Sequence, residues 1–301
     1  MRDPWITEPG PYDLTDEEYH ADPVVGGSIS SSGARTLLPV GPRPGSPALY
    51  QYEREHRRQR DYYDFGHLVH TLLLGTGAEI VEVKADDWKT KRAQDARKKI
   101  RAEGRVPVLT AQLLVAHEMV LAVLAHPVVG PLFVRPGLAE TSYVARDPET
   151  KVMCRARVDW MPHVADDARL LVVDYKTAVN ASPSGFERVM WEHGYHMQGP
   201  WYCDVLSWLE RNHGLEPQFI LVAQEKTPPY LVSYGWPSAR AIEWGRVLNR
   251  KARDVYRQCV EADDWPGYGD EAQEWDIPGW LDRLYTDEYE LGLYNISGDI
   301  R

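Results

Sequence analysis

The stretch RLLVVDYKTAV, residues 169–179, decides the fold. Its apolar run LLVV is typical of a buried strand. The run ends directly in Asp174, Tyr175 and Lys176. Because side chains alternate along a strand, Asp174 and Lys176 point to one face and Tyr175 to the other. Packing alone does not require an acid and an amine two positions apart, so this pair predicts a functional site.

A second acid lies on the preceding predicted strand, KVMCRARVDWM (151–161), where Asp159 alternates with apolar residues. If the two strands pair, the carboxylates of Asp159 and Asp174 meet at one point, with Lys176 beside them. Adjacent carboxylates repel each other, and a divalent cation that prefers oxygen ligands, such as magnesium or manganese, relieves that repulsion. The lysine would then hold or deprotonate an attacking water. The alternative is a surface ion pair at a strand end, which is the commoner explanation of an isolated D-x-K.

The remaining periodicity predicts an α/β or α+β core preceded by helices. Helices are expected at 33–38 (with Ser32 as its cap), 65–75, 84–105, 109–127, 183–211 and 238–262, and strands at 140–146, 151–161, 169–176 and 218–226. The turn DPET joins the first two strands into a hairpin. We expect a single domain over 1–301, with a helical part (1–127), a sheet–helix core (128–262) and an acidic C-terminal tail (263–301).

Composition excludes several classes of protein. The 301 residues are 43% hydrophobic and 26% charged, as in ordinary globular proteins. No apolar run is long enough to span a membrane and the N-terminus does not resemble a signal peptide, so we expect a cytoplasmic protein without a membrane partner. The cysteines are widely separated, which argues against disulfides, structural zinc and an iron–sulfur cluster: Cys154, Cys203 and Cys259.

Charge is distributed unevenly. The net charge is −11, yet the segment 84–105 has nine basic and four acidic residues, a local charge of +5. The segment 261–290 has eleven acidic residues and one basic residue, a local charge of −10. A basic segment of this kind is compatible with local binding of a polyanion such as DNA. A solvated helix face is the alternative, and it is the commoner explanation of such a run alone.

The arrangement D-(x14)-D-x-K on adjacent strands resembles the PD-(D/E)xK nuclease superfamily, and more narrowly the phage and prophage exonucleases of the RecE (exonuclease VIII) type. Further segments carry the resemblance across nearly the whole chain: SISSSGARTLL (28–38), FGHLVHTLLLG (65–75), ASPSGFERVMWEHGYHMQGPWY (181–202), VAQEKTPPYLV (222–232) and WPGYGDEAQEWDIPGW (265–280). Two positions depart from the pattern. Val158 replaces the proline that gives the motif its name, and Pro200 interrupts the Gln198–Tyr202 turn.

The resemblance implies a restriction-endonuclease-like core, with a mixed central sheet flanked by helices. It implies that Asp159 and Asp174 are metal ligands, that Lys176 is the catalytic lysine, and that His70 is a third ligand. Gln198 and Tyr202 would lie beside the scissile phosphate, and Glu140 would be an extra ligand through water. Alternatively, His70 is a core histidine and Glu140 a solvated strand-end residue. The expected DNA-binding residues are Ser30, Ser32, Arg35, Lys98, Lys99 and Arg101.

The activity that the resemblance implies is magnesium-dependent hydrolysis of linear double-stranded DNA, with manganese as a substitute metal. Digestion would run 5′-to-3′ and leave 3′ single strands for an annealing protein of the RecT type. A ring-shaped homo-oligomer, encoded by a phage or prophage and working in the bacterial cytoplasm, is implied as well. The alternatives are a repair nuclease of the same fold that acts on single strands, and a non-catalytic DNA-binding protein of that fold.

Overall fold

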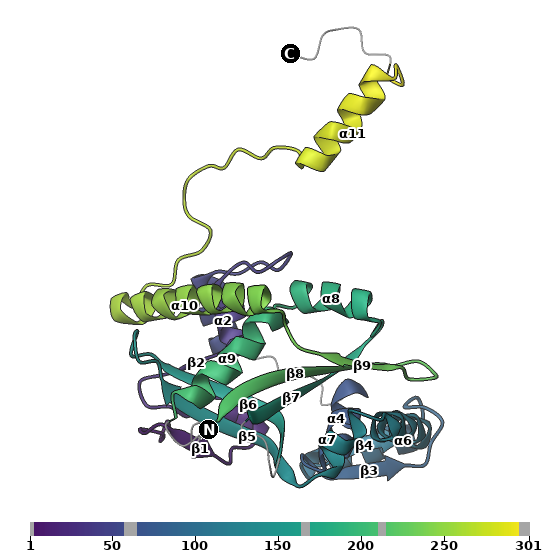
Figure 1. Cartoon of the computed structure of the whole chain (residues 1–301). Coiled ribbons are helices and arrows are strands. Elements are labelled where there is room, and N and C mark those ends of the chain that lie inside the picture. The colour runs from purple at the N-terminus through teal and green to yellow at the C-terminus, as the bar shows by residue number, and fades with distance from the viewer. Residues whose placement is uncertain (1–2, 57–64, 164–168, 210–214, 295–301) are drawn as a thin grey trace. The chain divides into compact units, whose positions relative to one another are not determined.

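The computed structural model describes residues 3–56, 65–163, 169–209 and 215–294 (Figure 1). Contacts divide the chain into two units, Met1–Gly267 and Tyr268–Arg301. The described part of the second unit contains the helix α11 (Gly279–Glu290), in which no residue is buried. The described sheets and the remaining helices all belong to the first unit.

A mixed sheet runs through the first unit. Among the described residues it has seven strands, in the order β1-β5-β6-β7-β8-β9, with β2 paired to β6. The strands are β1 (Gly10–Tyr12), β2 (Ile29–Ser30), β5 (Gly137–Arg146), β6 (Met153–Pro162), β7 (Arg169–Ala178), β8 (Glu216–Glu225) and β9 (Val232–Gly235). The pairs β2–β6 and β7–β8 are parallel, whereas β5–β6, β6–β7 and β8–β9 are antiparallel. The predicted α/β class with a mixed central sheet is therefore confirmed.

Helices cover both faces of this sheet (Figure 1). The helices of the first unit are α1 (Asp16–His20), α2 (Ser31–Leu37), α3 (Pro47–Glu55), α4 (Phe65–Leu74), α5 (Lys91–Ala102), α6 (Thr110–Ala125), α7 (Gly130–Val134), α8 (Pro183–Glu192), α9 (Tyr195–Ser207) and α10 (Ala239–Ala262). One face packs against α2, α9 and α10, and the other against α4, α6 and α7. Among the described helices, none combines the length and hydropathy that a bilayer crossing requires.

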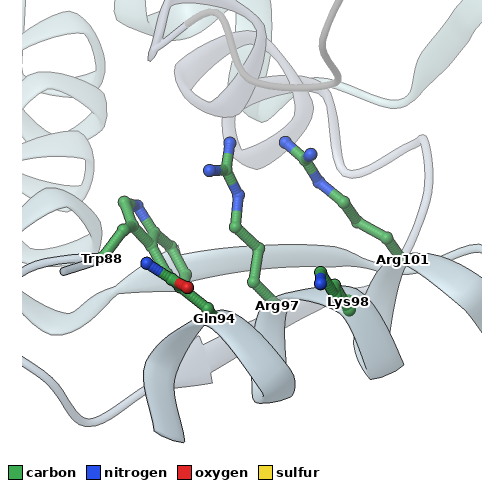
Figure 2. Close-up of a pocket in the computed structure, with 5 residues that line it drawn as sticks. All are labelled: Trp88, Gln94, Arg97, Lys98 and Arg101. Carbon is green, nitrogen blue, oxygen red and sulfur yellow. The ribbon is translucent and has the colours of Figure 1, made fainter. Parts of the chain in front are cut away.

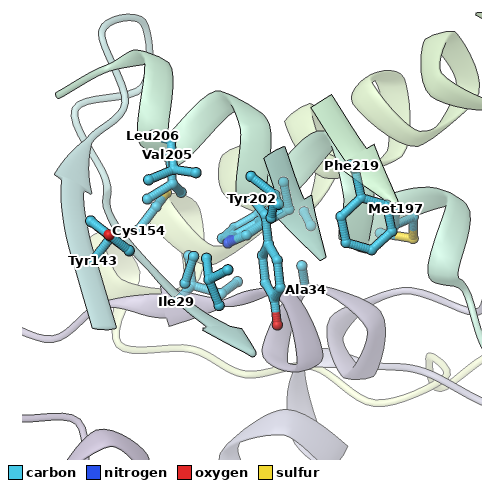
Figure 3. Close-up of a cluster of buried hydrophobic side chains, with 14 of the residues drawn as sticks. Ile29, Ala34, Tyr143, Cys154, Met197, Tyr202, Val205, Leu206 and Phe219 are labelled. Atoms are coloured by element: carbon cyan, nitrogen blue, oxygen red, sulfur yellow. The ribbon is translucent and has the colours of Figure 1, made fainter. Parts of the chain in front are cut away.

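Strand β7 explains why the apolar run LLVV is continuous. Val172 belongs to the hydrophobic cluster under α9 and α10, whereas Val173 and Tyr175 belong to the cluster on the α4 side. Figure 3 shows part of the first cluster, in which Met197 and Phe219 pack near Tyr202. Because both faces of the strand are buried, it needs apolar residues at successive positions rather than at every second one.

Several element boundaries differ from those expected. Ser30 rather than Ser32 caps α2, since the Ser30 side chain accepts the amide of Gly33. The expected helix 183–211 is divided into α8 and α9 at Gly194, whose φ of +69° interrupts the helix. The elements that were not anticipated are short or peripheral: β1, α1, β2, α3, β3 (Ile80–Val83), β4 (Val106–Leu109), α7, β9 and α11.

Helices α9 and α10 approach each other closely at Gly245. A Cβ atom added there would lie 2.0 Å from the backbone oxygen of His196. That carbonyl precedes Pro200 by four residues, and Pro200 has no amide hydrogen to donate to it. The absence of a side chain at Gly245 therefore permits the close helix contact on which the position of α9 depends.

Gly245→Ala is expected to destabilise the protein by about 1–3 kcal/mol, because the new methyl group would force two backbones apart. In a helix without this contact the same change would stabilise by about 0.5–1 kcal/mol, so the sign of the effect distinguishes the two cases. Thermal unfolding is the measurement. Gly235→Ala is the control, because a Cβ at Gly235 meets nothing within 4 Å. A raised midpoint for Gly245→Ala would contradict the packing described here.

Candidate active site

The site lies where β6 and β7 part. Among the described residues the two strands pair at Trp160 and Val173. The same antiparallel register places Asp159 opposite Asp174. At that position the Asp159 Oδ2 atom accepts the amide N–H of Tyr175 at 3.0 Å. The Asp159 carboxylate thus accepts a backbone N–H of β7 that a carbonyl of the neighbouring strand would otherwise accept. The two strands separate around the two acids.

Strand β5 is also irregular at this level. Glu140 has a φ of +48°, which is uncommon for a residue with a side chain, and the β5–β6 pairing passes over Glu140 and Asp159. Local departures of this kind re-aim side chains next to functional sites. Here the departure lets Glu140 face the same point as Asp159, as their shared contact with His70 shows.

Five side chains meet at this opening. The Lys176 Nζ atom lies 2.7 Å from Asp174 Oδ2 and 3.8 Å from Asp159 Oδ2. From α4, His70 Nε2 lies 3.1 Å from Asp159 Oδ2, and its Nδ1 lies 3.2 Å from Glu140 Oε1. We call these residues the carboxylate cluster: His70, Glu140, Asp159, Asp174 and Lys176. The structure thus brings together the five residues that the sequence singled out as metal ligands or as the catalytic lysine.

Burial and mutual charge separate the two aspartates electrostatically. Burial raises the pKa of Asp159, but the charges of Lys176 and His70 outweigh burial and hold that pKa well below its usual range. Burial, together with the charge of Asp159, raises the pKa of Asp174 to about 6. Near neutral pH one carboxylate is thus firmly ionised, while the other is close to gaining a proton.

The cations and Glu140 respond to the same charges. Burial lowers the pKa of Lys176, but Asp159 and Asp174 outweigh it and raise that pKa above its ordinary value. Burial likewise lowers the pKa of His70, and the charge of Asp159 more than compensates. Burial and the charge of Asp159 raise the pKa of Glu140. Three carboxylates are therefore crowded around the Lys176 ammonium and the His70 imidazole.

Helix α9 supports the cluster from the other face of the sheet. Gln198 Nε2 donates to Asp174 Oδ1 at 2.7 Å and to the Tyr202 hydroxyl at 3.0 Å. Pro200 lies inside α9, yet the Gln198–Tyr202 pair keeps its contact. The ring of Tyr202 packs in the hydrophobic cluster of Figure 3 and so fixes the position of its hydroxyl. Gln198 and Tyr202 accordingly orient the carboxylate of Asp174.

Sequence reasoning missed two side chains of the site. Arg157 Nε lies 2.7 Å from Glu140 Oε2, which holds that carboxylate in place. The Lys176 ammonium lies 5.8 Å from the centroid of the Tyr195 ring, a cation–π distance. The sequence spacing of both residues could have indicated their place in the site. Arg157 shares a strand face with Asp159, and Tyr195 precedes Gln198 by three residues on one helix face.

The predicted DNA-binding residues fall into two places. Ser30 caps α2 and its hydroxyl lies 3.0 Å from that of Ser32. Arg35 donates to the carbonyl of His193 at 2.7 Å and lies 6.0 Å from the Tyr195 ring, so it approaches the carboxylate cluster through Tyr195. The other three, Lys98, Lys99 and Arg101, lie on α5, outside the cluster. If the basic segment does not bind DNA, the next candidates are Arg54, Arg57, Arg58 and Arg60, of which the last three lie outside the described residues.

The donor set suits a divalent cation. One ligand atom each from His70, Glu140 and Asp159 lies within 4.8 Å of the others. Asp174 adds a buried carboxylate next to them, through its contact with Lys176. Carboxylate oxygens, which Glu140, Asp159 and Asp174 supply, are ligands that suit magnesium and manganese. A cation would also relieve the mutual repulsion that raises the pKa values of Glu140 and Asp174.

Comparison with known proteins supports the fold. No model of a known protein family matches the chain, and no curated protein matches it. Among solved structures, the chain is similar to a protein from Eubacterium rectale described as "Putative exonuclease", with a TM-score of 0.55 and 13% sequence identity. The match covers 90% of this chain and 98% of that chain. The chain therefore shares its fold with that protein over nearly its whole length.

Proposed function

We propose that this chain is a magnesium-dependent exodeoxyribonuclease of the PD-(D/E)xK superfamily, of the RecE type. The observation that carries the proposal is the convergence of Asp159, Asp174 and Lys176 where β6 and β7 part, with His70 and Glu140 beside them. The fold shared with a protein described as an exonuclease supports the same function. A binding protein without catalysis would not need a lysine held between a buried acid, Asp174, and a partly buried one, Asp159.

The proposed metal ligands are His70, Glu140, Asp159 and Asp174. A bound magnesium ion supplies charge at the scissile phosphate and lowers the pKa of the attacking water. Arg157 fixes Glu140, and Gln198 fixes Asp174, so both carboxylates keep their orientation without help from substrate. Such fixed positions reduce the reorganisation that the reaction would otherwise require.

Lys176 has a different task. Its raised pKa keeps the side chain protonated near neutral pH, so in this state it donates hydrogen bonds and cannot accept a proton. The ammonium is held between Asp159 and Asp174 and against the Tyr195 ring. Lys176 therefore orients the attacking water and offsets negative charge that develops on the phosphate.

The resemblance to the RecE type extends the proposal beyond the site. We propose digestion of linear duplex DNA from 5′ to 3′, by a ring-shaped homo-oligomer that hands its 3′ single strands to a RecT-type annealing protein. A gene of phage or prophage origin and action in the bacterial cytoplasm belong to the same proposal. Light scattering on the purified chain tests the oligomer, and 5′-labelled against 3′-labelled duplex tests the direction.

The proposed function is tested with end-labelled linear duplex DNA and covalently closed circular DNA, each incubated with magnesium or with a chelator. We expect magnesium-dependent loss of the linear duplex while the closed circle survives, because an exonuclease needs an end. Degradation of both substrates at the same rate would indicate an endonuclease. A marked preference for single-stranded DNA would support the repair nuclease, and no degradation of any substrate would contradict the proposal.

A further inference from the structure

A basic pocket lies beside α5, outside the carboxylate cluster. Its volume is about 240 Å³, and it is lined by Trp88, Gln94, Arg97, Lys98 and Arg101 (Figure 2). Helix α5 packs on the two parallel strands β3 and β4, and no residue of this small assembly belongs to the carboxylate cluster. Within the described residues, the pocket is therefore a feature that the proposed chemistry does not use.

Helix geometry brings the basic side chains together. Arg97 and Lys98 lie three and four residues after Gln94, and Arg101 lies four and three residues after them, so these side chains share a face of α5. Figure 2 shows the side chains of Arg97 and Arg101 extending from α5 in the same direction. The side chain of Thr90 accepts the amide of Ala93 and fixes the start of the helix. The positions of these side chains therefore follow from a regular helix whose start is fixed by a cap.

The direction of Arg97 is fixed by an aromatic ring. Its guanidinium carbon lies 5.1 Å from the centroid of the Trp88 ring, within the range of a cation–π interaction. Trp88 lies just before the start of α5 and lines the pocket. Its contact with Arg97 therefore holds the guanidinium in the pocket wall. A preoriented guanidinium loses less side-chain freedom when it binds a ligand.

Two of the basic residues that line the pocket, Arg97 and Lys98, have no acidic partner among the described residues. None of the described residues that line the pocket is acidic. Neither Arg97 nor Lys98 forms an ion pair within the described residues, whereas Lys89 pairs with Asp87 and Arg105 pairs with Glu79. Arg97 and Lys98 therefore bring to the pocket two positive charges that no described acid pairs with.

The shape and chemistry favour a phosphate group as the ligand. A pocket of about 240 Å³ is smaller than the usual ligand pocket of about 300–1,000 Å³. Arg97 presents planar donors that match phosphate oxygens, and Lys98 adds a further positive charge. A group with several negative oxygens satisfies these donors better than a single carboxylate does.

We propose that this pocket binds a backbone phosphate of the DNA substrate, at a second point separate from the carboxylate cluster. The inference rests on the proposed function, since it takes DNA as the source of the phosphate. Contacts to phosphates carry no sequence information, so the pocket adds affinity for DNA of any sequence. It also keeps DNA attached between successive cleavage steps, which raises the number of nucleotides removed in each binding event.

The test compares two pairs of substitutions on the same helix. Arg97→Gln with Lys98→Gln removes two charges from the pocket. Arg92→Gln with Lys99→Gln removes two charges from residues that do not line it. Binding of the full chain to a labelled linear duplex is measured in calcium over a range of salt concentrations. We expect the slope of log affinity against log salt to fall by about 0.9 for each phosphate that the pocket pair no longer neutralises, and to stay unchanged in the control pair.

Equal slopes in the two pairs would overturn the inference, because the basic segment would then act only through its overall charge. If Arg97→Gln prevents folding, Lys98→Glu and Lys99→Glu carry the same comparison, since both lysines are exposed. Inorganic phosphate is the second probe. If phosphate raised the melting temperature of the unmodified chain but not that of the pocket pair, while both pairs kept the original slope with DNA, the ligand would be free phosphate rather than DNA.

The same experiment separates this inference from the proposed function. If the unmodified chain degrades linear DNA and the pocket pair keeps the original slope, the inference alone fails. If the chain degrades no DNA but the pocket pair binds DNA with the reduced slope, the nuclease proposal fails and the role of the pocket in holding DNA remains.

Discussion

Replacing Lys176 by methionine is expected to lower the rate of DNA hydrolysis by about 10²–10³-fold, the loss that follows removal of a donor that stabilises charge in the transition state. Methionine keeps most of the length and the apolar stem of lysine but has no charge. Asp174 would lose its 2.7 Å partner and take up a proton more readily, rather than remain as an unpaired buried charge. The measurement is the initial rate of nucleotide release from linear duplex DNA in magnesium.

A role in folding alone would give a different pattern. The Lys176→Met variant should keep its circular dichroism spectrum and should still bind linear DNA in calcium. Retention of more than about a tenth of the original rate, well above what loss of such a charge-stabilising donor permits, would mean that Lys176 does not act in the chemical step.

Asp159→Asn is expected to produce an equally large loss of activity. Asparagine is similar in size and can still accept the Tyr175 amide through its side-chain oxygen, but it brings no negative charge to His70, Lys176 or a metal. Changing a residue that hydrogen-bonds to a metal ligand already lowers metal affinity or activity by about 10–100-fold. Changing a direct ligand should lower the activity at least as much. The rate of magnesium-dependent hydrolysis is the measurement.

A matched control is available in Asp147, another buried carboxylate. It pairs with Arg253 at 2.8 Å and accepts the Thr150 hydroxyl, and it does not belong to the carboxylate cluster. Asp147→Asn should lower the melting temperature while leaving hydrolysis intact at a temperature where the protein is folded. If Asp147→Asn and Asp159→Asn lost activity to the same extent, the loss would reflect stability rather than ligation.

The centre of the sheet could be predicted from the sequence because two physical signals agree there. A continuous apolar run indicates a strand that is buried on both faces, and polar residues at its end indicate a site. The alternation of β6 also placed Asp159 toward the opening where Asp174 and Lys176 lie. Strands β5 to β8 therefore lie close to where the residue pattern placed them.

Features that depend on tertiary contact could not be predicted in the same way. The parting of β6 and β7 depends on Asp159 accepting a backbone amide, and no periodicity encodes that bond. His70 has apolar neighbours, so only its position on α4 against β5 and β6 distinguishes it from a core histidine. Strands β3 and β4 have four residues each, too few for a pattern of alternation to stand out.

The basic segment 84–105 shows a further limit of prediction from the sequence. Sequence reasoning selected Lys98, Lys99 and Arg101 by charge density. Lys98 and Arg101 do line the pocket, but Lys99 does not, and Arg97 and Trp88 were not selected. The density of positive charge is visible in the sequence. Which charges share a face follows from the exact start of α5, and that start is set by the Thr90 cap.

The central claim is that the carboxylate cluster binds a divalent metal ion, and manganese binding followed by electron paramagnetic resonance tests it most directly. The titration is made without DNA, on the unmodified chain and on the Asp159→Asn variant. We predict saturable binding that magnesium displaces in the unmodified chain, and an affinity weakened by at least about tenfold in the variant. Equal manganese binding by the two proteins, or no saturable binding by either, would contradict the account.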